Sequence, residues 1–312
     1  MSEIQIPATA PVEPLPGGPS TAIEREFTIK ERKQWQMVLT RFLRHRLAVA
    51  SLIVLILVIL MAYVVPLFWK YAFTDVSSPG SSPPTLNNPL GTDQIGHDLF
   101  AQVMRGTQQS LKVAFIVAVL STGIGAPYGA ISGYYGGRVD TIMMRVCDVL
   151  LTLPVLAVAG AIVVGHGGSV TVVALVLGLL GWVVNARVVR GVVLSLREQE
   201  FIEAARALGG STPRIVFRHL LPNVTGAIIV QATLDVAAAI LAEAALSFVG
   251  IGVQAPDISL GVLVNAARTA VDTRPWLFYF PGLVIIIIAL TVNFVGDGLR
   301  DAFDPRQTRQ RR

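Results

Sequence analysis

Long apolar segments alternate with short polar segments along most of this chain of 312 residues. Six segments carry few or no charged residues and are long enough to cross a bilayer as helices. They cover residues 47–65, 110–131, 143–165, 169–190, 224–250 and 277–297. The first of them, at 47–65, would span roughly 28 Å as a helix. The pattern predicts an all-α membrane protein with six transmembrane helices.

The first 30 residues are rich in proline and nearly free of aromatic residues. Such a composition cannot bury enough apolar surface to order itself, so residues 1–30 are expected to be a disordered tail. They are not expected to be a signal peptide, because the first apolar segment begins only at Leu47 and has no small-residue cleavage site. Residues 72–109 are polar and rich in turn-forming residues, and they predict a loop with at most one short helix.

Lysine and arginine are distributed unevenly between the two sides of the predicted helix bundle. All but five of the 25 lie in the terminal segments or in the regions in and beside the second-to-third and fourth-to-fifth connections. The five on the other side are Lys70, Arg105, Lys112, Arg268 and Arg274. Because cytoplasmic loops carry the excess of basic residues, both termini and the fourth-to-fifth connection are predicted to be cytoplasmic.

The fourth-to-fifth connection is the longest charged interruption of the apolar pattern. Residues 203–208 are good helix formers, and the two glycines at 209–210 supply a stop. Thr212 is expected to cap a second short helix, with Pro213 at its first position. Pro222 is expected to end that helix before the fifth apolar segment. The pattern predicts two short helices joined by a turn.

Three short motifs resemble a known family. Residues 203–222 begin with Glu-Ala-Ala, have glycine at 209 and end with Leu-Pro, which resembles the EAA loop of permease subunits of binding-protein-dependent ABC importers. The stretch LGTDQIGHD at 90–98 resembles a signature of the dipeptide, oligopeptide and nickel branch, although His97 stands where that signature has arginine. The stretch GDGLRDAFDPR at 296–306 closely resembles the ending of the C-type permease of dipeptide and oligopeptide importers.

The resemblance implies that this chain is a C-type permease subunit and that its EAA loop is a coupling helix seated in a groove of a cytoplasmic ATPase subunit. The residues expected to make the coupling loop are Glu203, Ala204, Ala205, Gly209, Arg214, Arg218, Leu221 and Pro222. The resemblance also implies a second homologous permease, two ATP-binding cassette subunits and an extracytoplasmic solute-binding protein as partners. Peptide is the expected substrate, and nickel chelates, opines or other small solutes remain open.

The same resemblance divides the chain after its tail. Residues 31–105 would hold the first transmembrane helix and an extracytoplasmic loop, residues 106–306 a permease domain with five transmembrane helices, and residues 307–312 a basic tail. The protein is expected in the cytoplasmic membrane of a bacterium or archaeon, in contact with lipid and with no nucleic acid as partner. ATP and Mg²⁺ are expected on the ATPase subunits, and no cofactor is expected on this chain.

The chain lacks the sequence features of an ATPase or a zinc protease. None of its lysines follows a glycine, so a phosphate-binding loop of the form GxxxxGK[ST] is impossible. No HExxH motif occurs, and the single cysteine, Cys147, excludes an intramolecular disulfide and a thiolate-rich metal site. We therefore expect that this chain is not an enzyme and that a separate subunit hydrolyses ATP.

Carboxylates inside the predicted helices are functional candidates, because an uncompensated charge is costly in lipid. Asp235 and Glu243 would lie about 12 Å apart along the fifth helix and roughly 80° around it. Both are candidates for the translocation path, and an architectural role stays open for Glu243. For Asp148, an ion pair with Arg145 is the favoured interpretation.

Two alternatives stay open in the coupling loop. Glu203 pairs either with Arg206, three residues on, or with a basic group of the partner. Arg214 and Arg218 share one helix face and meet either acidic groups of the ATPase or lipid phosphates. The mechanism inferred is mechanical: a rigid short helix is pushed, and the spanning helices change between inward-open and outward-open packings.

Two rival functions come from other classes. A secondary transporter would couple an ion gradient to solute movement through Asp235 and Glu243. A membrane scaffold would have no transport path and no ATPase partner. The first predicts transport that survives ATP depletion and collapses with the proton gradient, and the second predicts that the chain purifies without an ATPase.

Overall fold

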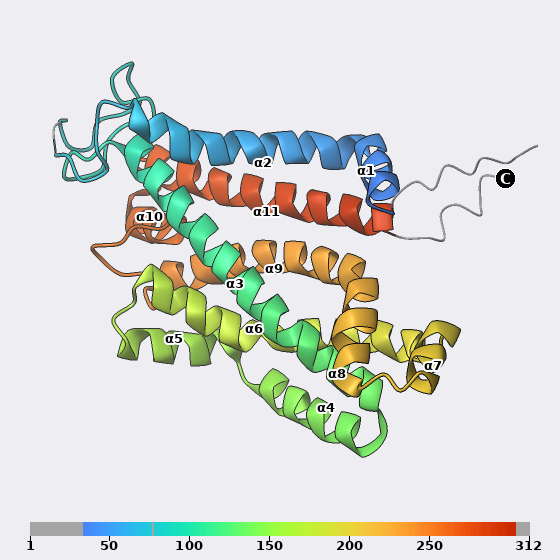
Figure 1. Cartoon of the computed structure of the whole chain (residues 1–312). Coiled ribbons are helices and arrows are strands. Elements are labelled where there is room, and N and C mark those ends of the chain that lie inside the picture. Colours follow the sequence, from blue (N-terminus) through green and yellow to red (C-terminus); the bar gives the residue numbers. More distant parts are fainter. Residues whose placement is uncertain (1–33, 77, 304–312) are drawn as a thin grey trace, which may run out of the picture. The chain divides into compact units, whose positions relative to one another are not determined.

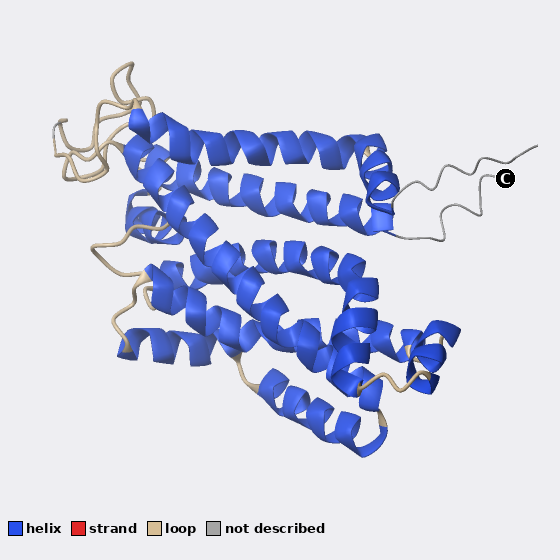
Figure 2. Cartoon of the chain, viewed as in Figure 1, coloured by secondary structure: helices blue, strands red, loops and turns tan. Residues whose placement is uncertain are grey.

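The computed structural model describes residues 34–76 and 78–303, and this part of the chain is almost entirely helical (Figures 1 and 2). Its elements are α1 Gln34–Arg44, α2 Arg46–Val64, the 3-10 turn η1 Val65–Leu67, α3 Leu99–Tyr135, α4 Gly137–Thr152, α5 Val155–Gly165, α6 Val170–Leu196, α7 Glu200–Ala207, α8 Thr212–Arg214, the π-helical segment η2 Ile215–Leu220, α9 Leu221–Val249, α10 Leu260–Ala267, the 3-10 turn η3 Arg268–Ala270 and α11 Trp276–Phe303. The all-α prediction is confirmed. The predicted tail at 1–30 and the end of the C-terminal motif, 304–306, lie outside the described residues.

Five helical segments are long and apolar enough to cross a membrane. They are Arg46–Leu67, Leu99–Tyr135, Val170–Leu196, Thr212–Val249 and Trp276–Phe303. The predicted third span, 143–165, is not one helix, because α4 and α5 meet at a bend of 76°. Pro154 lies at the bend; proline has no N–H to donate and disfavours a helical conformation of the residue before it. The described chain therefore has five continuous spans, and six if the bent pair counts as one.

α3 is longer than the sequence pattern predicts. It begins at Leu99, so the expected loop at 72–109 ends earlier than predicted. The start is fixed by Asp98, whose buried carboxylate accepts the backbone N–H of Ala101 at 3.0 Å. The same carboxylate accepts hydrogen bonds from the side chains of Trp69, at 2.9 Å, and Asn88, at 2.8 Å. The capping residue thus also ties down the loop that follows η1.

The closest helix contact in the bundle is between α3 and α6. Gly125, Gly129 and Gly133 are spaced four apart on α3, and each faces the backbone of α6. A Cβ atom at Gly129 would overlap the carbonyl oxygen of Ala186, so only glycine allows this approach. Gly178 of α6 meets α3 in the same way further along. In lipid no hydrophobic driving force holds two helices together. Small residues at this spacing allow close van der Waals packing, which stabilises the contact instead.

The other long helices pack around this pair. α9 contacts both α3 and α11, and α2 packs along α11. Figure 1 shows α2 and α11 running side by side, with α1 turned away at their end and α3 crossing the bundle diagonally. The short helix α10 packs on α9, α11 and α3. The largest apolar core lies where these helices meet, and it includes the buried side chains of Val113, Ile240, Leu260 and Ile288.

We expect Gly129→Ala to destabilise the bundle by about 1–3 kcal/mol, because the added methyl group must push α3 away from α6. The matched control is Gly123→Ala on the same helix, where an added Cβ would have no neighbour within 4 Å. The control should be neutral or more stable by up to about 1 kcal/mol, because alanine favours a helix. Thermal unfolding of the two variants in detergent micelles compares them, and equal melting temperatures would contradict the role given to the contact.

Candidate functional site

The connection between α6 and α9, residues 197–220, holds the predicted coupling loop. Its first helix, α7, ends in a Schellman motif: Gly210 N–H donates to Ala205 C=O, and Gly209 N–H donates to Arg206 C=O, both at 2.9 Å. Gly209 has φ +78°, a left-handed conformation that costs other residues about 1–2 kcal/mol. The predicted glycine stop between two helices is therefore present, and Gly209 is required by its backbone conformation.

The second half of the connection differs from the prediction in two respects. Helix α8 starts at Thr212 with Ser211, not Thr212, at the capping position, and Ser211 makes no side-chain capping bond. Pro222 does not end the helix, which continues through η2 into α9 as one span, Thr212–Val249. Within η2 the backbone N–H of Leu221 donates to Val216 C=O, the wider π-helical pattern. This wider turn accommodates a proline, which has no N–H and would crowd the carbonyl four residues earlier.

Buried apolar side chains fix the connection to the bundle. Ile202 of α7 and Ile215 and Leu220 of η2 are fully buried. They pack in one cluster with alanines and valines of α3 and α6, among them Ala130 and Val193. This cluster continues the α3–α6 contact to the end of the bundle. Figure 1 shows α7 beyond the ends of the long helices and α8 beside the end of α3, where the chain changes direction before α9.

The opposite side of the connection is exposed. Glu203, Ala204, Arg214 and Arg218 are exposed, and so are two large apolar side chains, Leu208 and Phe217. Of the remaining predicted coupling residues, Ala205 and Leu221 are half-buried and Pro222 is exposed. An acid, several arginines and exposed apolar side chains on one protruding segment form a surface that another protein can bind.

The local pair considered for Glu203 is not formed. Arg206 instead lies over the ring of Tyr134 in α3, with its guanidinium carbon 5.0 Å from the ring centre, and its Nε donates to the Tyr134 hydroxyl at 3.3 Å. Within the described part of the chain, Glu203 has no side-chain hydrogen bond or ion pair. Its carboxylate is thus available to a partner.

Two ion pairs hold the helices together near this connection. Asp140 of α4 accepts both Nε and Nη2 of Arg190 in α6, and it also accepts the hydroxyl of Ser132 in α3. Local sequence patterns do not predict this pair, because the two residues are far apart in the chain. Asp148 pairs with Arg145 at 3.7 Å, as expected, and additionally with Arg187 of α6.

A polar cluster lies in the middle of two spanning helices. Asp235 of α9 accepts hydrogen bonds from Asn185 of α6, at 2.5 Å, and from Gln231 one turn earlier, at 3.1 Å. Asp235 is half-buried, so part of its carboxylate stays accessible. Asp235 is one of the predicted path residues, but neither amide is, because nothing in the local pattern brings Asn185 to it.

Glu243, the other predicted path residue, is placed differently. Its side chain has no exposed surface. Its two oxygens accept the hydroxyls of Ser110 in α3 and Ser247 in α9, each at 2.8 Å. Those hydroxyls in turn accept the backbone N–H groups of Leu260, at 3.4 Å, and Val253, at 3.1 Å. In this arrangement Glu243 joins α3, α9 and the start of α10 and is enclosed by them.

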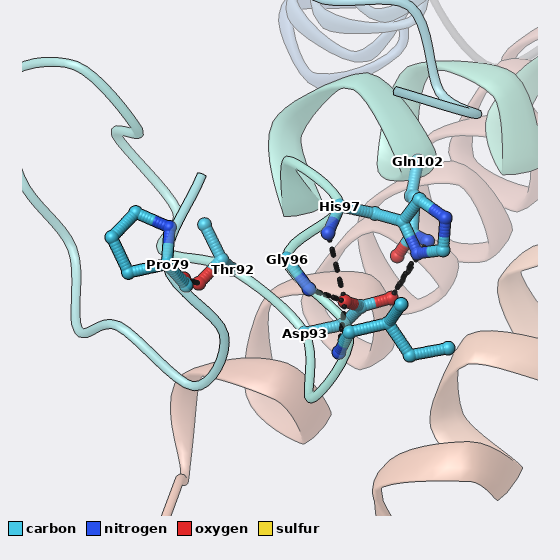
Figure 3. A network of polar contacts seen from close by, with 7 residues as sticks. Pro79, Thr92, Asp93, Gly96, His97 and Gln102 are labelled. Atoms are coloured by element: carbon cyan, nitrogen blue, oxygen red, sulfur yellow. Dashed lines mark hydrogen bonds and ion pairs between the residues drawn. The ribbon is translucent and has the colours of Figure 1, made fainter. Parts of the chain in front are cut away.

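The signature-like stretch at 90–98 forms a compact turn before α3, drawn in Figure 3. Asp93 is its centre: one oxygen accepts the backbone N–H groups of Ile95, Gly96 and His97, and the other accepts the side chains of His97, at 2.7 Å, and Gln102, at 3.1 Å. Burial raises the pKa of the Asp93 carboxyl, but the bonds from His97 and Gly96 outweigh this effect and leave the pKa below its ordinary value. Both oxygens are occupied, so Asp93 shapes the turn.

Comparison with known families gives two matches. Residues 125–309 match the family described as the binding-protein-dependent transport system inner membrane component. Residues 33–84 match the N-terminal TM domain of oligopeptide transport permease C. Together the two matches cover the first span and the chain from the last part of α3 onward.

Similar proteins include the oligopeptide transport system permease protein OppC of Mycobacterium tuberculosis (strain ATCC 25618 / H37Rv), which is 45% identical over 279 residues, or 88% of this chain and 96% of that protein. The protein of that name from Bacillus subtilis (strain 168) is 37% identical over 292 residues, 93% of this chain and 96% of the relative. A solved structure of the MetNI methionine ABC transporter, in an inward-facing conformation, has a TM-score of 0.54 at 18% identity, covering 65% of this chain and 97% of that one. This last likeness concerns the fold.

The turn around Asp93 should loosen in acid. Its pKa is lower in the folded chain than the ordinary 3.8, so its stabilising effect is complete above that value and is lost as the pH falls through the folded pKa. We expect the amides at 95–97 to lose protection from hydrogen exchange below about pH 4, relative to intrinsic exchange rates. Asp93→Asn should lose protection already at neutral pH, whereas the control Asp75→Asn, at an exposed acid of the same loop, should behave as wild type. Unchanged protection in Asp93→Asn would contradict the role of Asp93.

Proposed function

The chain belongs to the binding-protein-dependent transport system inner membrane components and is a permease subunit of an ABC importer; we propose that peptides are its substrate and that the 197–220 connection receives the ATPase. The peptide assignment rests on relatives that are named oligopeptide permeases and align over nearly their full length. The match to the N-terminal domain of permease C supports the C-type position in the complex.

The single observation that carries the coupling role is the two-sided character of the connection. One side is anchored by Ile202, Ile215 and Leu220 in the α3–α6 cluster. The other side exposes Glu203, which has no partner of its own in the described chain, beside exposed arginines. A force applied to this surface is transmitted directly to α9, because α8, η2 and α9 form one span.

The transport path is proposed to pass the cluster of Asp235, Asn185 and Gln231. Peptides of different sequence share a backbone, an amino group and a carboxylate. A half-buried carboxylate flanked by two amides offers hydrogen-bond acceptors and donors to such common groups. Glu243 is proposed to be architectural, because its oxygens are enclosed by serine hydroxyls.

The remaining partners and the orientation belong to the same proposal. Both termini and the 197–220 connection face the cytoplasm of a bacterial or archaeal cell, as the distribution of lysine and arginine indicates. The complex would contain a second homologous permease, two ATP-binding cassette subunits with their ATP and Mg²⁺, and an extracytoplasmic solute-binding protein. ATP hydrolysis would take place on those subunits, since this chain has no phosphate-binding loop.

The test is ATP hydrolysis and peptide uptake by the reconstituted complex. We expect Glu203→Gln to lower ATP hydrolysis stimulated by peptide-loaded binding protein by about tenfold or more, since a charge-assisted hydrogen bond to the ATPase is worth about 1.5–3 kcal/mol. The matched control is Glu198→Gln, because Glu198 is an exposed acid just before α7 that pairs with Arg197 of this chain. Equal activity of the two variants, or failure of any ATPase subunit to copurify with wild type, would contradict the coupling role.

A separate measurement tests the path. We expect Asp235→Asn to lower the maximal rate of peptide uptake roughly tenfold, because the variant loses a charge-assisted hydrogen bond to the peptide. Uptake by wild type should require ATP and should persist when a protonophore collapses the proton gradient. Asp272→Asn, at an exposed acid outside the spans, is the control. Uptake that survives ATP depletion and stops with the protonophore would favour the secondary transporter instead.

A further inference from the structure

A lysine in the spanning part of the bundle has no charged counterpart among the described residues. Lys112 of α3 is exposed and makes no hydrogen bond or ion pair with any described residue. The neighbouring residue on the same face, Phe115, is 69% exposed. A cation at such a position costs free energy unless it reaches an anion or water, so an unpaired lysine here needs an external partner.

Lys112 lies at an apolar cavity of about 430 Å³ between four helices. Leu55, Ile59 and Tyr63 line it from α2; they are spaced four apart and therefore form one strip about 12 Å long. Val236 of α9 and Val292 of α11 also line it. An elongated apolar cavity with a single cation matches an amphiphile, which has a hydrocarbon chain and an anionic head.

The cavity is distinct from the proposed peptide path. Ser110, two residues before Lys112 and about 200° around the helix, faces α9 and donates to Glu243. Lys112 therefore faces the other side of α3, toward α2, whereas Asp235 points to Asn185 in α6. The span that contains α2 is also the least buried of the five continuous spans, since only 17% of its apolar stretch is buried within the described chain.

The depth and direction of Lys112 indicate where the anion lies. Gln108, one turn before Lys112, donates to the carbonyl of Ala62 at 2.7 Å, so Lys112 lies one turn below the level of Tyr63. Side chains on a helix point back toward its N-terminus, and for α3 this is the end near Tyr63 and η1. The ammonium group is thus directed from the apolar cavity toward the membrane interface, as in snorkelling lysines.

We propose that this cavity binds one anionic phospholipid, with an acyl chain along Leu55 and Ile59 and the phosphate paired with Lys112. On the topology proposed above, the lipid belongs to the extracytoplasmic leaflet. The lipid fills a gap that α2 leaves beside α3 and α9 and joins the first span to the other spans.

The test is native mass spectrometry of the purified complex of permeases and ATPase subunits, extracted from a membrane that contains phosphatidylglycerol. Lys112→Met should retain one phosphatidylglycerol fewer per complex than wild type, and Lys112→Arg should retain the wild-type number. Val292→Phe, which narrows the cavity and keeps the lysine, should also lose the lipid. Lys70→Met is the matched control, because Lys70 is an exposed loop lysine that is bonded to Asn87.

Equal lipid retention in Lys112→Met and Lys70→Met would overturn the proposal. A photocrosslinker in place of Phe115 provides an independent measurement: crosslinking to phospholipid supports it, and crosslinking to the second permease shows that protein covers the cavity and overturns it. Copurification with ATPase subunits and peptide-stimulated ATP hydrolysis are measured on the same samples. If these persist while lipid retention is unchanged, the lipid site fails and the proposed transport function does not.

Discussion

The arrangement of the whole bundle depends on the close approach of α3 and α6. The three glycines spaced four apart bring the two backbones into contact, and van der Waals packing over this surface replaces the hydrophobic effect that is absent in lipid. The cluster that holds Ile202, Ile215 and Leu220 continues the same surface, so the 197–220 connection can be seated only where α3 and α6 meet. The position of the proposed ATPase-binding surface is thus a consequence of a contact inside the bundle.

The helix that leaves this connection links the two ends of the molecule. At one end η2 accommodates Pro222 without interrupting the helix, so α8, η2 and α9 form one helical span. At the other end Glu243 is hydrogen-bonded to serines of α3 and α9, and through their hydroxyls to the backbone at the start of α10. A buried carboxylate with both oxygens satisfied is costly to break, so the far end of α9 is firmly held. The half-buried Asp235 lies between these two ends.

The sequence predicted the class of fold, most spans, the glycine stop at 209 and a protruding connection, because each depends on local composition. The bend at Pro154 was not predicted, because the hydropathy of a segment shows whether it is long and apolar enough to span the membrane and does not show whether it forms one unbroken helix. The sequence also placed the helix end at Pro222, where the local rule for proline is overridden by the π-helical turn. The pairs Asp140–Arg190 and Asp235–Asn185 join residues far apart in the chain, and no periodicity in one segment reveals them.

Burial separates the roles of the charged groups in the spans more clearly than charge does. The side chain of Glu243 is fully buried and surrounded by hydrogen-bond donors of this chain, so its charge serves to hold the helices together. Asp235 is satisfied by two amides yet remains half-buried, and under the proposed function it exchanges a protein donor for a donor of the substrate. Lys112 is exposed and has no partner in the described chain, which requires one from outside. The same cost of charge in lipid therefore selects three different solutions within one bundle: internal satisfaction, exchange and an external ligand.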